Sequence, residues 1–197
     1  MKTDVTNIMV CGIGGQGVMT AADILATTAL DLGYDVKKTE VAGMAQRGGV
    51  VTSHVRFGEK VFSPSIAPGE ADLILAFEPA EALRWSTHMR QEGMIMVNSY
   101  AQLPPVVSIG LFDYPDDPFK QLEEKGLNAH QFDAGHAAIE LGDRRLVNSI
   151  MLGAIADHLP FPAETLEHHL LTRFKAKGEK VVDMNRKAFS LGRNAFA

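Results

Sequence analysis

Three glycines near the start of the chain have the spacing of an anion-binding turn. Gly12, Gly14 and Gly17 follow a short apolar run within VCGIGGQGVM, and a helical pattern begins directly after them. Glycine permits a tight turn and a close backbone approach, and the N–H groups at the start of a helix attract anions. Gly12, Gly14, Gly15, Gln16 and Gly17 are therefore candidates to bind phosphate, although a strand-to-helix turn can also need glycine for its geometry alone.

The second strand indicates which phosphate-bearing ligand fits. An NAD site usually has an acidic residue near the end of this strand, where it binds the ribose hydroxyls. Here Lys37, Lys38 and Thr39 stand at that place, and Glu40 comes only after them. Side chains alternate along a strand, so one lysine faces the crevice and the other turns away. The pattern favours NADP or coenzyme A over NAD, and a solvated pair at an edge of the sheet is the alternative.

The loop AGMAQRGG adds a second group of candidates. Gln46 and Arg47 offer hydrogen-bond donors to a carboxylate, phosphate or carbonyl group, and Met44 offers an apolar contact. Gly48 and Gly49 give the backbone freedom directly after them. A ligand contact and an ordinary surface loop explain this composition equally well.

No pattern of catalytic or metal-binding residues stands out in the chain. Its seven histidines are scattered, and neither a G-x-S-x-G motif nor a P-loop occurs. The single cysteine, Cys11, excludes an internal disulfide and a self-contained iron–sulfur or zinc–thiolate site. Its position at the end of an apolar strand predicts a buried packing residue. We expect no catalytic residue and no metal site in this chain.

Composition and charge narrow the class of protein. The 197 residues are 46% hydrophobic and 22% charged, as is ordinary for one folded domain. A net charge of -5 supplies no basic surface for nucleic acid. The polar N-terminus lacks the core of a signal peptide, and no apolar run reaches membrane-spanning length. We expect a cytoplasmic protein that binds neither nucleic acid nor a membrane.

Alternating strand and helix patterns predict the elements that position the candidates. Strands are expected at 8–11, 34–41, 50–57, 61–64, 72–77, 94–98 and 128–133, and helices at 16–32, 79–91, 119–125, 134–142, 146–158, 162–173 and 179–191. The runs 50–57 and 61–64 are expected to form a hairpin. In the helix over 79–91, Glu81, Arg84 and His88 share a polar face.

This order of elements predicts one α/β domain over residues 1–197. We expect an open, mostly parallel Rossmann-like sheet flanked by helices, with a helical C-terminal region from about residue 134 that packs on the sheet or on a partner. Such sheets bind ligands at the carboxyl ends of their strands. The glycine turn and the AGMAQRGG loop both begin at that edge.

Two segments together resemble a known family. GIGGQGVMTAADILA and GYDVKKTEVAGMAQRGGVVTSHVRFG resemble the gamma domain of the 2-oxoacid:ferredoxin oxidoreductases. The loop GMAQRGG looks most like the beta subunit of the indolepyruvate:ferredoxin oxidoreductases. The resemblance runs from about residue 7 to the C-terminal helices, where NSIMLGAIADHLPFP is also similar.

The resemblance implies an accessory subunit of an oxidoreductase complex that acts on a 2-oxoacid such as indolepyruvate or another aryl-pyruvate. In this family a larger chain carries thiamine diphosphate and iron–sulfur clusters and passes electrons to ferredoxin, and coenzyme A takes the acyl group. The isolated chain is then expected to be inactive, and to be able to form a homodimer through surfaces that the larger chain normally covers.

The resemblance also implies roles for the candidate residues. The turn Gly12–Gly17 matches the family's site for the nucleotide end of coenzyme A, and Lys37–Thr39 match a KKS run that contacts phosphate in related single-chain enzymes. The segment from Met44 to Gly49 resembles one that approaches the partner's thiamine site, so it would line the substrate entrance.

Two other functions agree with the residues. A stand-alone NADP-dependent reductase would use the glycine turn and the two lysines. A non-catalytic interaction protein would leave the crevice empty and bind no nucleotide.

Overall fold

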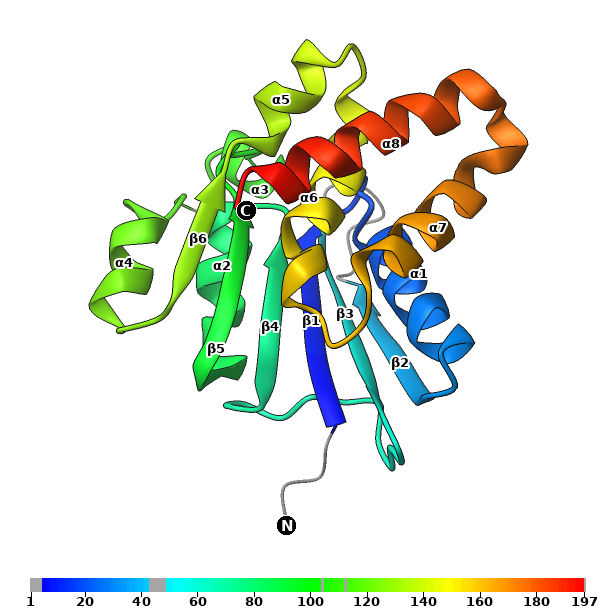
Figure 1. Cartoon of the computed structure of the whole chain (residues 1–197). Coiled ribbons are helices and arrows are strands. Elements are labelled where there is room, and N and C mark those ends of the chain that lie inside the picture. The colour runs from blue at the N-terminus through cyan, green and yellow to red at the C-terminus, as the bar shows by residue number, and fades with distance from the viewer. Residues whose placement is uncertain (1–4, 43–48, 104, 112, 197) are drawn as a thin grey trace.

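The structure, a computed structural model, describes residues 5–42, 49–103, 105–111 and 113–196. Six strands in these ranges form one sheet in the order β2-β3-β1-β4-β5-β6 (Figure 1). Their bounds are β1 Val5–Ile13, β2 Asp35–Ala42, β3 Val50–Gly58, β4 Ala71–Ala76, β5 Met89–Asn98 and β6 Ala129–Phe132. Strands β1, β4, β5 and β6 are parallel, and β3 is antiparallel to both β1 and β2. The predicted open, mostly parallel sheet is confirmed.

Helices cover both faces of the sheet (Figure 1). One face carries α1 Val18–Asp31, α6 Val147–Ile155, α7 Ala163–Phe174 and α8 Glu179–Asn194, and the other carries α2 Pro79–Trp85 and α4 Pro118–Glu124. Helices α3 Pro105–Ser108 and α5 Ala134–Glu140 lie at the carboxyl edge of the sheet. Single turns of 3-10 helix span Ser86–His88, Arg144–Leu146, Ala156–His158 and Lys175–Lys177. None of the described helices is both long and apolar enough to span a membrane.

Strand β1 separates two apolar cores because its side chains alternate between the faces. Ile8 and Val10 pack toward α1 and the C-terminal helices, and Met9 and Cys11 pack toward α2 and α4. All four side chains are fully buried, which explains why residues 8–11 of the strand are all apolar. The prediction that Cys11 is a buried packing residue is confirmed, and burial raises the pKa of its thiol well above the ordinary value.

Helices α6 and α8 approach so closely that only glycine fits at their contact. A Cβ atom at Gly153 would lie 2.1 Å from the carbonyl oxygen of Phe189, and one at Gly192 would lie 1.8 Å from that of Ile150. The backbones of the two helices are thus in direct contact, and α6 is held between α8 and the sheet.

The predicted hairpin is wrong. No strand forms over residues 61–64, and β3 pairs instead with β1 and β2. The Arg56 guanidinium binds the carbonyl oxygens of Ser63 and Ser65 at 3.1 and 2.8 Å, and the backbone N–H of Val61 donates to Asp35. Side chains therefore bind the Val61 N–H and the Ser63 carbonyl group, which a hairpin could have paired.

The helix predicted over 79–91 is too long. Helix α2 ends at Trp85, and β5 begins at Met89, which pairs with Ala71 of β4. Glu81 does not lie on an exposed polar face, because it is fully buried beside Glu78. Burial raises the pKa of both carboxyl groups.

A histidine pair lies on the α2 face of the sheet, where His54 is buried and His88 is partly buried. The rings of His54 and His88 meet edge to face with centroids 6.1 Å apart, and Nδ1 of His54 accepts a hydrogen bond from the backbone N–H of Ile66 at 3.0 Å. Burial lowers the pKa of both rings, and the nearby His88 and Arg56 lower that of His54 further. Folding therefore favours the neutral form of both rings.

The contact between α6 and α8 predicts that a single methyl group at Gly192 destabilises the fold. Gly192→Ala should lower the free energy of unfolding by about 1–3 kcal/mol, because overpacking forces the helix backbones apart. Urea denaturation measures the change. Ser190→Ala, at an exposed position of the same helix, should change stability by less than about 0.5 kcal/mol. Equal stability of the two variants would contradict the close contact.

The histidine pair predicts a pH dependence with a definite sign. A ring with a lower pKa in the folded protein takes up its proton more readily in the unfolded chain. The contribution of His54 to the free energy of unfolding is therefore fully present above its unfolded pKa of about 6.5, and it decreases as the pH drops below that value. His54→Gln should lose less stability than the wild type between pH 7 and pH 5 in urea titrations. Parallel losses in both proteins would contradict this assignment.

Candidate functional site

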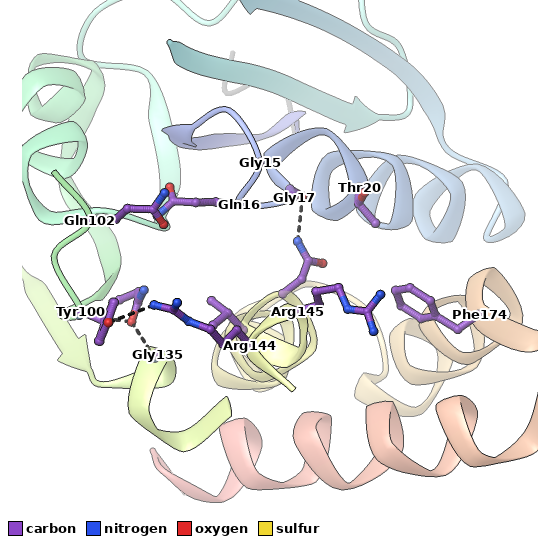
Figure 2. Close-up of a pocket in the computed structure, with 13 residues that line it drawn as sticks. Gly15, Gln16, Gly17, Thr20, Tyr100, Gln102, Gly135, Arg144, Arg145 and Phe174 are labelled. Atoms are coloured by element: carbon purple, nitrogen blue, oxygen red, sulfur yellow. Dashed lines mark hydrogen bonds between the residues drawn. The ribbon is translucent and has the colours of Figure 1, made fainter. Parts of the chain in front are cut away.

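A pocket of about 650 Å³ opens at the carboxyl edge of the sheet, where α1 begins (Figure 2). The pocket is formed by five parts of the chain: the glycine turn, the end of β5, helix α5, the segment that leads into α6, and the end of α7. The lining residues are Gly15, Gln16, Gly17, Thr20, Asn98, Tyr100, Gln102, Gly135, Arg144, Arg145, Val147, Asn148 and Phe174. Neighbouring parallel strands β1 and β4 send their helices to opposite faces here, which is where open α/β sheets bind ligands.

The glycines of the turn have distinct structural roles. Gly15 and Gly17 have φ angles of +103° and +86°, in the left-handed region that favours glycine. A Cβ atom at Gly12 would lie 2.7 Å from Oε1 of Gln16. The backbone N–H of Gly14 donates to the carbonyl oxygen of Gly49 at 2.8 Å, which ties the turn to the start of β3.

The side chain of Gln16 closes the turn rather than presenting its amide to the pocket. Its Oε1 accepts a hydrogen bond from the backbone N–H of Ile13 at 2.7 Å, and its Nε2 donates to the carbonyl oxygen of Phe77 at 3.1 Å. Nδ2 of Asn98 donates to the same Phe77 oxygen at 3.1 Å. Gln16 therefore joins the ends of β1 and β4.

The start of α1 is the first feature that suits an anion. Gly17 caps the helix without a side-chain hydrogen bond, and the first turn holds no acidic residue. Both Gly17 and Thr20 line the pocket. The backbone N–H groups of this turn thus have no side-chain acceptor from their own cap, and the helix dipole adds a positive potential.

Arg144 is the second feature of the pocket that suits an anion. Its Nη2 donates to Oη of Tyr100 at 3.0 Å, and its guanidinium carbon lies 5.8 Å from the centre of that ring. Within the described residues no carboxylate forms an ion pair with Arg144. Arg145 differs, because it binds Asp143 through Nη2 at 2.6 Å and holds the pKa of that carboxyl below its ordinary value.

The wall opposite the glycine turn depends on a close contact between Tyr100 and Gly135. A Cβ atom at Gly135 would lie 2.3 Å from Cγ of Tyr100. Oδ1 of Asn98 accepts hydrogen bonds from the backbone N–H of Tyr100 at 3.3 Å and from that of Gly135 at 3.2 Å. Figure 2 shows Tyr100, Arg144 and Gln102 toward one end of the pocket.

The other end of the pocket holds an aromatic ring. Phe174 lies there beside Arg145 (Figure 2). Nζ of Lys177 lies 5.3 Å from the centre of this ring. A partly buried aromatic ring that lines a pocket beside a guanidinium group suits a flat heteroaromatic ligand such as a nucleobase.

The predicted lysines do not line this pocket. Nζ of Lys37 binds Asp35 at 2.5 Å, and Lys38 binds Asp23 of α1 and Glu40. They and Thr39 lie on β2, which is an edge strand. This arrangement agrees with the alternative of a solvated lysine pair at a sheet edge, a common feature of exposed strands.

Of the residues predicted to line the substrate entrance, the structure describes Gly49. Met44, Gln46, Arg47 and Gly48 lie outside the described residues. Gly49 is described, and its hydrogen bond with Gly14 places the end of the AGMAQRGG loop beside the glycine turn.

Sequence reasoning missed the pocket residues that follow β5. Tyr100, Arg144, Asn148 and Phe174 lie far from the glycine turn in the chain, and no local pattern links them to it. The one available signal was the adjacent pair Arg144 and Arg145 directly before a buried helix.

Comparisons with known proteins agree on one family. The family model described as "Pyruvate ferredoxin/flavodoxin oxidoreductase" matches residues 7–195. The "Indolepyruvate oxidoreductase subunit IorB" of Pyrococcus horikoshii is 40% identical over 190 residues, which cover 94% of this chain and 93% of that protein.

Two solved structures share the fold. The 2-oxoglutarate:ferredoxin oxidoreductase from Magnetococcus marinus, solved with 2-oxoglutarate, coenzyme A and succinyl-CoA bound, superposes with a TM-score of 0.76 at 20% identity, over 98% of this chain and 31% of that chain. The gamma subunit of a keto/oxoacid ferredoxin oxidoreductase from Geobacter sulfurreducens gives a TM-score of 0.69 at 23% identity, over 97% and 98% of the two chains. Because the family model spans nearly the whole sequence and a relative shares 40% of its residues, this chain belongs to the pyruvate ferredoxin/flavodoxin oxidoreductase family.

Proposed function

We propose that this chain is an accessory subunit of a 2-oxoacid:ferredoxin oxidoreductase and that it binds coenzyme A in the pocket at the start of α1. The observation that carries the proposal is that one pocket is lined both by a helix N-terminus without a side-chain cap and by Arg144, which lacks an ion-pair partner among the described residues. These features suit the phosphate groups of a nucleotide.

The residues present fit coenzyme A as the ligand. The turn Gly15–Gly17 and Arg144 would hold phosphate groups, and the Phe174 ring would contact the adenine base. Coenzyme A supplies the thiol that accepts an acyl group. The subunit's own contribution is to hold and orient this ligand, which speeds a reaction through proximity rather than through acid–base chemistry.

The chemistry of the oxidation belongs to a larger partner chain in this proposal. Thiamine diphosphate and iron–sulfur clusters are bound there, and ferredoxin accepts the electrons from the complex. The only cysteine of this subunit, Cys11, is buried within the sheet and holds its proton, so it offers no ligand to a cluster. The name of the Pyrococcus horikoshii relative supports indolepyruvate as the 2-oxoacid.

Three points stay predictions: a substrate-entrance role for the segment from Met44 to Gly49, a homodimer in the absence of the larger chain, and a cytoplasmic location. Phosphate contacts from Lys37, Lys38 and Thr39 are the alternative to binding in the pocket. Rearrangement of the ion pairs with Asp35, Asp23 and Glu40 would have to free the lysines first.

Calorimetric titration of the full chain tests the proposal. We expect coenzyme A to bind, and Arg144→Ala to weaken binding about tenfold, which is the loss of one charge-assisted hydrogen bond of ~1.4 kcal/mol. Arg186→Ala removes an exposed arginine that pairs with Asp183 outside the pocket, so it should leave the affinity unchanged.

Lys38→Ala distinguishes the two possible phosphate sites. Because Lys38 does not line the pocket, we expect its removal to change the affinity for coenzyme A less than twofold. Binding that depends on Lys38 and not on Arg144 would move the phosphate site to β2. Binding of NADP without binding of coenzyme A would contradict the proposed function and support a reductase.

A further inference from the structure

One buried side chain from the C-terminal helices reaches the glycine turn. Nδ2 of Asn148, near the start of α6, donates to the carbonyl oxygen of Gly17 at 2.7 Å, and this bond joins residues 131 positions apart. In Figure 2 it is the dashed line that ends at Gly17. Asn148 is only 5% exposed and also lines the pocket. The contact is therefore internal to the protein and lies at the edge of the proposed anion site.

The contact falls on the residue that starts α1. Gly17 has a φ angle of +86°, and its carbonyl oxygen also accepts the first hydrogen bond of the helix, from the N–H of Ala21 at 3.0 Å. A Cβ atom at Gly17 would lie 2.7 Å from Nδ2 of Asn148. The asparagine thus takes the space that a side chain at Gly17 would occupy, and it holds the peptide whose orientation directs the N–H groups of the first turn.

Stability alone does not explain an asparagine at this position. Its Oδ1 is buried and has no hydrogen-bond partner among the described residues. A buried carbonyl group without a partner is unfavourable, and an apolar side chain of similar volume would avoid that penalty. The neighbouring Ser149 shows the contrast, because its Oγ is paired with Asn185 of α8 at 2.5 Å.

We propose that Asn148 is a positioning residue for the phosphate-binding turn. Its amide holds the Gly17 peptide so that the N–H groups at the start of α1 face the pocket, and the C-terminal helices thereby set the affinity of the site for a phosphorylated ligand. This inference rests on the proposed function, since it names what orients the same site.

The test compares three variants of the full chain by calorimetry with coenzyme A. Asn148→Leu keeps the branched arrangement of heavy atoms and removes the hydrogen bond, and Asn148→Asp keeps the shape but has an ionised carboxylate that cannot donate to Gly17. Ser149→Ala is the matched control, since it removes a buried hydrogen bond from the adjacent residue, which contacts α8 and not the turn. We expect both Asn148 variants to bind coenzyme A about tenfold more weakly or worse, and Ser149→Ala to bind within about twofold of the wild type.

Melting temperatures separate a positioning role from a general loss of stability. The proposal expects the affinity to fall in Asn148→Leu even where its melting temperature equals or exceeds that of Ser149→Ala. Wild-type affinity in Asn148→Leu, or equal losses of affinity in Asn148→Leu and Ser149→Ala, would overturn it.

Hydrogen–deuterium exchange tests the same inference without a ligand. The amides of residues 21–25 in α1 should exchange faster in Asn148→Leu than in Ser149→Ala, because only the first variant releases the Gly17 carbonyl group. If wild-type protein fails to bind coenzyme A, the proposed function has failed, and this exchange measurement still decides whether Asn148 holds the turn. Unchanged exchange in Asn148→Leu would overturn the positioning role.

Discussion

The site depends on one side chain that joins the ends of two parallel strands. Gln16 accepts a hydrogen bond from the Ile13 backbone and donates one to the Phe77 carbonyl group, so the turn after β1 is held against the end of β4. The helices that follow these strands leave toward opposite faces of the sheet, and this separation opens the pocket. Gly15 and Gly17 adopt positive φ angles, and these angles let the turn form the Gln16 hydrogen bonds and then begin α1.

The pocket has two sides with different origins. The glycine turn forms one side as part of the sheet, and residues after β5 form the other. Asn98 orders the second side by binding both Tyr100 and Gly135, and Arg144 then lies against the Tyr100 ring. The interlocked α6 and α8 place this second side relative to the sheet. In the proposed function, this pocket holds the ligand and the oxidation takes place on the larger partner chain.

Local patterns in the sequence predicted most of the fold, because apolar periodicity and glycine stops are local properties. The C-terminal helices and the buried strands β4 and β5 are examples. The helix over 79–91 and the hairpin at 61–64 were wrong, because the pairing of Met89 with Ala71 and the pairing of β3 with β1 are long-range contacts. The glycine turn was found from its spacing. Arg144 was missed because only the folding of distant segments brings it to the turn. The lysines of β2 were predicted to bind phosphate because their ion pairs with carboxylates are seen only in the folded structure.

The proposed function requires the start of α1 to hold the phosphate groups of coenzyme A. A titration of the 15N-labelled full chain with coenzyme A, followed by two-dimensional NMR, detects this contact residue by residue. We expect the largest changes in amide shift at Gly15, Gly17 and the first turn of α1, with smaller changes in the segment from Arg144 to Asn148. Changes centred on Lys37 to Thr39, with the glycine turn unaffected, would contradict this requirement.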